Sequence, residues 1–173
     1  MITPDYARLM ARYNRCQNDN LYAAAATLTD ADRRAERGAF FGSIHGTLAH
    51  LAWGDLAWMS RFDGGPPPAG ALATSARAFD DWTGLTQTRA TLDARIATFA
   101  ETLDVDRLTA PLVWRSGALG RMVRQPLWVA IAHFFNHQTH HRGQTHALLT
   151  GAGARPGDTD LILLDLCVEP PSP

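Results

Sequence analysis

Apolar residues recur at spacings of three and four along most of this chain, a pattern that predicts amphipathic α-helices. The pattern predicts four long helices, at about residues 4–28, 43–62, 82–103 and 126–151. Ser43 is a good N-cap for the second of them, and Pro126 and Gly151 bracket the fourth. In the third helix the apolar side chains should face inward, whereas Arg89 and Arg95 should point outward to solvent.

The segments between these helices show the composition of loops and short elements. Residues 63–70 are rich in glycine and proline and predict a loop, and residues 29–32 predict a cap and a short turn of helix. Residues 111–124 read as a short hairpin or an irregular crossover, and residues 161–166 as a last short apolar element.

Together these elements predict an all-α fold. We expect a four-helix bundle of up-down-down-up type, with short extra elements in the connections. At 173 residues the chain is long enough to bury a substantial core, and residues 1–173 should form a single domain.

Charge and composition narrow the classes of partner. The chain has 16 basic residues, all of them arginine, against 17 acidic ones, and the arginines are scattered. Phosphate binding needs a basic excess or stripe, so no nucleic-acid partner is expected. No apolar run is long enough to span a membrane, and the N-terminus does not resemble a signal peptide. Cys16 and Cys167 should be reduced thiols in a cytoplasmic protein.

Histidines concentrate in the fourth predicted helix. Five of the seven in the chain lie between His133 and His146. His133, His137 and His141 step by four, so they share one helical face, and two such imidazoles can chelate one metal ion. The pair that binds is either His133 with His137 or His137 with His141.

A metal held between helices needs a further ligand from another helix, and His50 is the best candidate. Gly46 and Gly54 lie one turn either side of His50. Inside a helix, glycine lowers helix stability by about 1 kcal/mol relative to alanine, so two glycines at these positions call for a structural explanation. They would let another helix, or a ligand, approach the imidazole closely.

Three protein ligands would leave coordination positions open, as in reactive metal sites. Imidazole suits zinc or nickel best, with iron or manganese as further options. The H-E-x-x-H protease motif is absent, because Gln138 follows His137 where the general-base glutamate would stand. This favours chemistry in which the metal lowers the pKa of bound water or of a bound thiol.

Two stretches of the chain resemble motifs of the DinB-like (damage-inducible) family. Residues 40–50 (FFGSIHGTLAH) with Asp55 resemble its second-helix motif, and residues 136–144 (NHQTHHRGQ) resemble its fourth-helix motif. The resemblance spans nearly the whole chain and implies a metal-binding four-helix bundle, commonly a dimer. It implies that His50, His137 and His141 are the metal ligands. Related transferases use such a site to activate a low-molecular-weight thiol such as bacillithiol or mycothiol.

The remaining polar candidates have plainer interpretations. His133 should line the pocket beside the metal or support a ligand histidine from behind. His45 should lie at a helix start or pocket rim. His140 and His146 should be surface residues. Asp55 either orients a ligand histidine or forms an ordinary salt bridge. Arg142 should tie the fourth helix to a neighbouring helix.

Three functions remain as hypotheses. The first is a metal-dependent transferase that activates a thiol for attack on an electrophilic small molecule. The second is a metal-dependent hydrolase of a small ester, amide or lactone, which a carboxylate near the metal, such as Asp55 or Asp19, would favour. The third is a non-catalytic, metal-stabilised dimeric stress protein, which a sealed site without a pocket would favour.

Overall fold

The computed structural model describes the backbone of residues 1–167 and the side chains of residues 1–164. The long helices are α1 (Pro4–Ala26), α3 (Ile44–Asp63), α4 (Trp82–Glu101) and α6 (Leu127–Gly151). The short helices are α2 (Asp30–Arg34), α5 (Val105–Thr109) and the 3₁₀ helices η1 (Leu72–Arg77) and η2 (Leu161–Cys167). The strands are β1 (Pro111–Ser116) and β2 (Arg121–Pro126). The prediction of a mainly helical chain is confirmed; the short helix α5 was not predicted.

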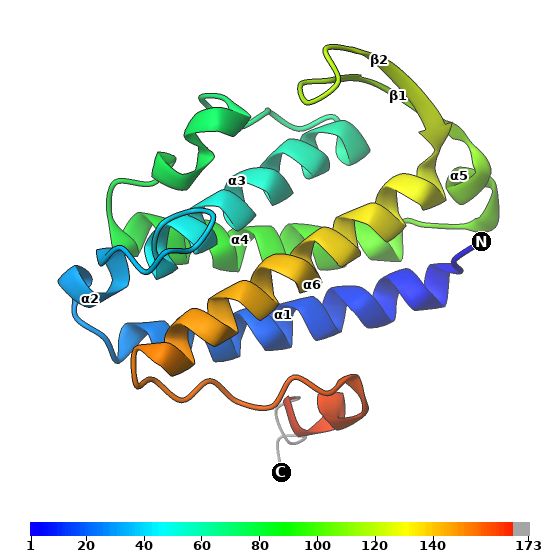
Figure 1. The fold of residues 1–173 in the computed structure, drawn as a ribbon. Coiled ribbons are helices and arrows are strands. Elements are labelled where there is room, and N and C mark those ends of the chain that lie inside the picture. The colour runs from blue at the N-terminus through cyan, green and yellow to red at the C-terminus, as the bar shows by residue number, and fades with distance from the viewer. Residues whose placement is uncertain (168–173) are drawn as a thin grey trace.

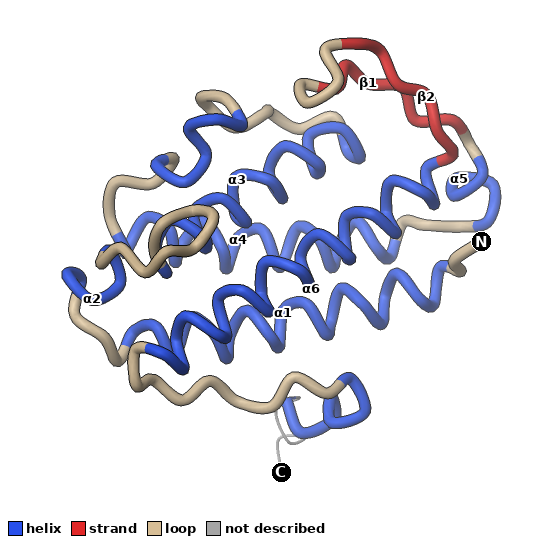
Figure 2. The backbone as a smooth tube through the Cα atoms, in the orientation of Figure 1, coloured by secondary structure: helices blue, strands red, loops and turns tan. Residues whose placement is uncertain are grey.

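The four long helices pack side by side (Figure 1). Helix α1 contacts α4 and α6, and α3 contacts the same two helices, so each long helix has two long neighbours. The chain runs in one direction along α1 and α6 and in the opposite direction along α3 and α4 (Figure 1). The connections lie outside this core (Figure 2).

Side-chain caps set the starts of α3 and α4. The backbone amide of Gly46 donates to Ser43 Oγ (3.0 Å), and the amide of Gly84 donates to Asp81 Oδ1 (2.7 Å). These bonds satisfy amides that have no partner inside the helix. Helix α3 ends at Gly64, whose φ of 76° is the left-handed conformation that glycine adopts at little cost.

The hairpin of β1 and β2 projects from one end of the bundle (Figure 1). Its strands pair antiparallel from Pro111 with Pro126 to Ser116 with Arg121. Of the two predicted alternatives, a hairpin or an irregular crossover, the hairpin is the one observed. Trp114 on its inner face packs edge-on against Trp58 of α3, with ring centroids 5.5 Å apart. This contact anchors the hairpin beside α3 and α6.

Arg89 is buried, so the prediction that it points to solvent is wrong. Its side chain, on α4, is only 4% exposed and forms ion pairs with Asp55 of α3 (2.6 Å) and with Asp93 one turn further along α4 (2.9 Å). Burial lowers the pKa of Arg89, but Asp93 and Asp55 outweigh that effect and hold the pKa above its usual value. The guanidinium therefore stays charged inside the bundle.

The two carboxylates extend this network to the other long helices. Gln138 of α6 donates to Asp55 Oδ2 (3.0 Å). Asn14 and Asn18 of α1 both donate to Asp93 Oδ1, at 3.1 and 2.9 Å. Arg142 of α6 donates to Asn14 Oδ1, which confirms the expectation that Arg142 ties α6 to a neighbouring helix. All four long helices thus contribute to one polar network inside the bundle.

Cys16 corrects a further expectation. It is disulfide-bonded, so the prediction of a reduced thiol at this position is wrong. The side chain of Cys167 lies outside the described residues. Among the helices of the described chain, none has the length and apolar character to cross a membrane.

Two arginines of α4 offer a matched test of the network. Replacing Arg89 with alanine leaves Asp55 and Asp93 buried without their cation, so the free energy of unfolding should fall by about 3–5 kcal/mol. Arg95→Ala removes a partly exposed ion pair with Asp63, 2.6 Å apart, and should cost at most about 1 kcal/mol. Urea denaturation followed by circular dichroism measures both. Equal losses in the two variants would mean that the buried network adds nothing beyond a surface ion pair.

Candidate metal centre

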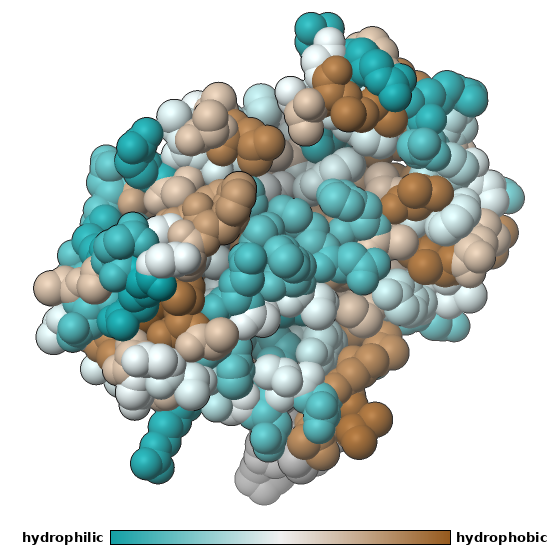
Figure 3. Space-filling model, in the orientation of Figure 1, coloured by the Kyte–Doolittle hydropathy of each residue, from teal (hydrophilic) through white to brown (hydrophobic). Residues whose placement is uncertain are grey.

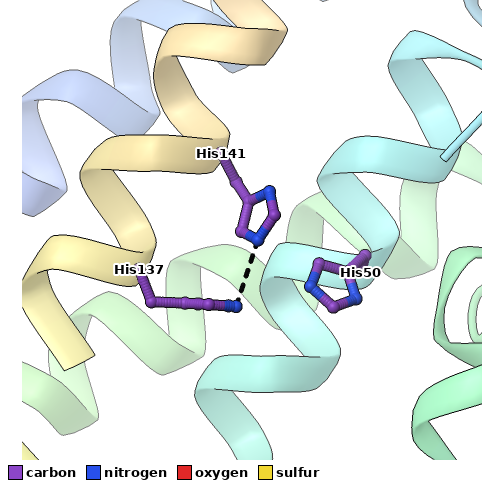
Figure 4. A group of neighbouring side chains, drawn as sticks. All are labelled: His50, His137 and His141. Carbon is purple, nitrogen blue, oxygen red and sulfur yellow. Dashed lines mark hydrogen bonds between the residues drawn. The ribbon is translucent and has the colours of Figure 1, made fainter. Parts of the chain in front are cut away.

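Three histidines meet between α3 and α6. His50 comes from α3, and His137 and His141 lie one turn apart on α6, with their rings converging (Figure 4). One ring nitrogen from each histidine lies within 4.8 Å of the other two. The Nε2 atoms of His137 and His141 are 3.1 Å apart. The structure therefore brings together the three residues that the sequence singled out, in an arrangement that could hold a metal ion.

Glycines make this close approach possible, as the sequence indicated. A Cβ atom on Gly54 would lie 3.1 Å from His137 Cε1, so an alanine there would press on the imidazole. A Cβ atom on Gly46 would lie 2.3 Å from the carbonyl oxygen of Phe41, closer than packing allows. One glycine thus admits His137, and the other admits the loop that carries Phe41.

A hydrogen bond fixes which nitrogen of His50 is free. His50 Nδ1 lies 2.8 Å from Ser75 Oγ, and the Ser75 hydroxyl donates to the carbonyl oxygen of Leu72 (2.7 Å). Since the hydroxyl proton is used there, Ser75 Oγ accepts from His50 Nδ1–H. The lone pair is then on Nε2, the nitrogen left for a metal. Ser75 lies in a stretch without a clear helical or strand pattern, so no local signal indicated its role.

His141 is oriented in the same way by its own helix. Its Nδ1 lies 2.7 Å from Gln144 Oε1, an atom that can only accept. His141 therefore carries its proton on Nδ1 and its lone pair on Nε2. Gln144 belongs to the fourth-helix motif, and a spacing of three residues on a helix was the available signal for this contact.

His137 is the member whose hydrogen bonding is incomplete. Its Nδ1 is buried without a partner among the described residues, and its Nε2 faces the lone pair on His141 Nε2. Two lone pairs at this separation repel unless a proton or a cation lies between them. The donor set consists of three imidazole nitrogens, two of which have their ring protons fixed on the far side. This set suits a divalent metal ion.

The surroundings keep these imidazoles neutral. Burial lowers the pKa of His50 to about 4, with a smaller contribution from His141. Burial lowers the pKa of His137 to about 3, and the neighbouring histidines add to the effect. The pKa of His141 is lowered by burial as well. Only neutral imidazole binds metal, so all three residues can bind metal at neutral pH.

A pocket of about 820 Å³ opens beside the centre, and His50 and His141 form part of its wall. Phe41 covers the same two histidines: its ring stacks on His50 with centroids 3.8 Å apart and meets His141 edge-on at 5.4 Å. Hydrophilic residues gather over the middle of this face, where α6 crosses the view (Figure 3). Because the pocket borders both His50 and His141, a small molecule can reach these histidines from the pocket side.

Asp55 and Gln138 belong to the buried polar network and not to the histidine centre. Asp55 is fully buried and bonds to Arg89 and Gln138, so the salt-bridge alternative holds and no ligand histidine is oriented by it. Gln138 is fully buried in the same network. The residue after His137 thus faces the bundle interior, away from the open side of the histidines.

The other histidines lie around the centre. His133 is exposed, with its ring centroid 5.9 Å from that of His137 and 5.1 Å from that of Trp58. His45 is buried, lines the pocket and bonds through Nε2 to the carbonyl oxygen of Phe79 (2.9 Å). His140 is exposed as expected, whereas His146 is half-buried.

Lowered histidine pKa values predict how pH affects the metal-free protein. In the unfolded chain histidine titrates near pH 6.5, whereas His50 and His137 stay neutral in the folded state down to about pH 4 and pH 3. As pH falls below 6.5 the unfolded state binds more protons, so stability falls. Melting temperatures should be lower at pH 5 than at pH 7, with a smaller drop for His137→Gln. A melting temperature that does not change with pH would contradict this.

Comparison with known proteins places the chain in a family. The model of the DinB family matches residues 1–167. No curated protein and no solved structure matches the chain. The family match covers both stretches that carry the three histidines, and the chain belongs to the DinB family.

Proposed function

We propose that His50, His137 and His141 hold a divalent metal ion, zinc or nickel, and that the protein is a metal-dependent transferase acting through a low-molecular-weight thiol. One observation carries the proposal: three neutral imidazoles converge beside an open pocket, with the proton positions of two of them fixed by Ser75 and Gln144. We propose a single-domain bundle of up-down-down-up type that acts as a homodimer. The disulfide at Cys16 argues against the expected cytoplasmic location, where thiols are kept reduced.

Three protein ligands leave positions open for a substrate atom. When bound, the metal would lower the pKa of a thiol and so supply a thiolate nucleophile at neutral pH. The chain's own residues prepare the site for this. Ser75 and Gln144 hold two imidazoles with their lone pairs inward, and Phe41 excludes water from above His50.

The structure weakens both rival functions. A hydrolase was expected to place Asp55 or Asp19 near the metal. Asp55 is held by Arg89 and Gln138, and Asp19 is exposed on α1 beside Arg15. A hydrolase would have to draw on Glu36, the carboxylate in the described wall of the pocket. A purely structural metal would need no such pocket.

Thiol conjugation is the direct experiment. Metal-loaded protein and His141→Ala would be assayed with a panel of bacterial thiols and an electrophilic acceptor, alongside small esters and lactones. We expect thiol-dependent product only with the metal-loaded wild type. Equal rates for the two proteins would remove the metal from the mechanism, and ester hydrolysis without thiol would favour the hydrolase.

Metal content should follow the three histidines. Alanine at position 50, 137 or 141 removes one of three ligands, so metal bound per chain should fall from about one to a small fraction of that value. His140→Ala is the matched control, because His140 is exposed next to His141 and should leave metal content unchanged. Elemental analysis of protein purified without a nickel column gives the result. Metal that persists in His50→Ala would exclude His50 as a ligand.

Gly54→Ala should weaken metal binding without removing a ligand. The added Cβ would press on His137 Cε1 from 3.1 Å and move the imidazole by a few tenths of an ångström. We expect metal affinity to fall by about tenfold, within the range for changes in residues that orient ligands. Gly143→Ala on α6, which meets no atom within 4 Å, is the control. Competition with a chromophoric chelator measures both, and equal affinities would show that the packing of Gly54 does not matter.

A further inference from the structure

The pocket beside the histidines has two opposing walls that come from connections between the long helices. One wall is the loop of residues 36–43, which leads from α2 into α3, and the other is η1, between α3 and α4. Both segments lie along α3 (Figure 1). The walls differ in charge, and that difference indicates what the pocket binds.

The loop wall presents a carboxylate. Glu36 Oε1 accepts from the backbone amide of Gly38 (2.8 Å). A Cβ atom on Gly42 would lie 2.8 Å from Glu36 Oε2, so the glycine leaves room for the carboxylate against the loop. Among the residues that the structure describes, no cation forms an ion pair with Glu36. The carboxylate is therefore held in place with its charge uncompensated.

The η1 wall presents a cation. Arg77 ends η1, and within the described part of the chain no carboxylate forms an ion pair with it. Arg34 also lines the pocket, but its guanidinium already forms an ion pair with Asp30 (2.8 Å). One uncompensated charge of each sign thus remains, on opposite walls.

Each wall adds an apolar side chain that the bundle does not cover. Phe40 on the loop is 87% exposed, and Leu72 at the start of η1 is 48% exposed. Both line the pocket. Exposed apolar side chains on both sides of a pocket favour a ligand with apolar surface, because binding removes that surface from water.

We propose that this pocket binds a small zwitterion: a molecule with an ammonium group toward Glu36, a carboxylate toward Arg77 and apolar groups between Phe40 and Leu72. A ligand with only one of these charges would leave the charge of the other wall without a partner. The inference deepens the proposed function by naming the substrate class of the same site. The inference rests on the proposed function only in taking the bound zwitterion to be a reactant.

Matched dipeptides test the proposal by binding alone. The probes are leucyl-phenylalanine, its N-acetyl form, which lacks the ammonium group, and its C-terminal amide, which lacks the carboxylate. Calorimetric titration of metal-loaded protein should show the free dipeptide binding about tenfold or more tightly than either blocked form, because each blocked form loses one charge-assisted contact. Blocked forms that bind as tightly as the free dipeptide would overturn the proposal.

Single substitutions assign each charge to its wall. Glu36→Gln should bind the free and the N-acetyl dipeptides equally and still discriminate against the amide, and Arg77→Gln should show the reverse. Glu101→Gln and Arg155→Gln change exposed residues that do not line the pocket and should retain both preferences. Unchanged preferences in Glu36→Gln or Arg77→Gln would also overturn the proposal.

The dipeptide-binding test and the thiol-conjugation assay can fail independently of each other. The predicted binding pattern without thiol conjugation would remove the transferase function and leave the pocket assignment standing. Thiol conjugation with no preference among the dipeptides would support the transferase function and overturn the pocket assignment.

Discussion

The ion pair between Arg89 and Asp55 is the contact on which the geometry of the bundle depends. Both side chains are buried, and a buried charge is tolerated only when it is paired and hydrogen-bonded. The same Asp55 oxygen accepts from Gln138 of α6, so one carboxylate joins α4, α3 and α6. Apolar side chains can slide past one another at small cost, whereas these bonds hold only over a few tenths of an ångström. We infer that the network sets the register of the helices.

That register also positions the histidines. On α3, Gly54 and Asp55 are consecutive, and on α6, His137 and Gln138 are consecutive. Gly54 contacts His137 while Asp55 bonds to Gln138, so two adjacent pairs meet across the same helix interface. A shift of α6 along α3 would break the bond to Asp55 and separate the imidazoles of α6 from His50 together. Polar bonds inside the bundle thus hold the alignment of the open site at its edge.

The sequence predicted the parts of this arrangement that repeat along one helix. Helical periodicity and caps located the long helices. The spacing of four residues indicated a histidine pair on α6, the glycines indicated His50, and the family resemblance implied the set of His50, His137 and His141. The prediction that Arg89 is exposed was wrong because an arginine in an amphipathic helix is normally exposed, and its partner Asp55 lies on another helix. The contact between His50 and Ser75 was missed for a related reason, because a hydroxyl in a short 3₁₀ segment has no periodic signature. Contacts between distant segments depend on packing, which no local pattern records.

The long helices and the connections between them contribute different parts of the candidate site. The long helices carry the three histidines and the network that aligns them, so this part of the site belongs to the bundle. The walls of the pocket come from the loop before α3 and from η1, whose residues, apart from the buried Ser75, are exposed or half-buried. Substitutions at Glu36, Phe40, Leu72 or Arg77 remove few core contacts, so the walls can change without disturbing the histidines. In the two proposals, metal binding would therefore be set by the bundle and ligand preference by its connections, so that each could change without the other.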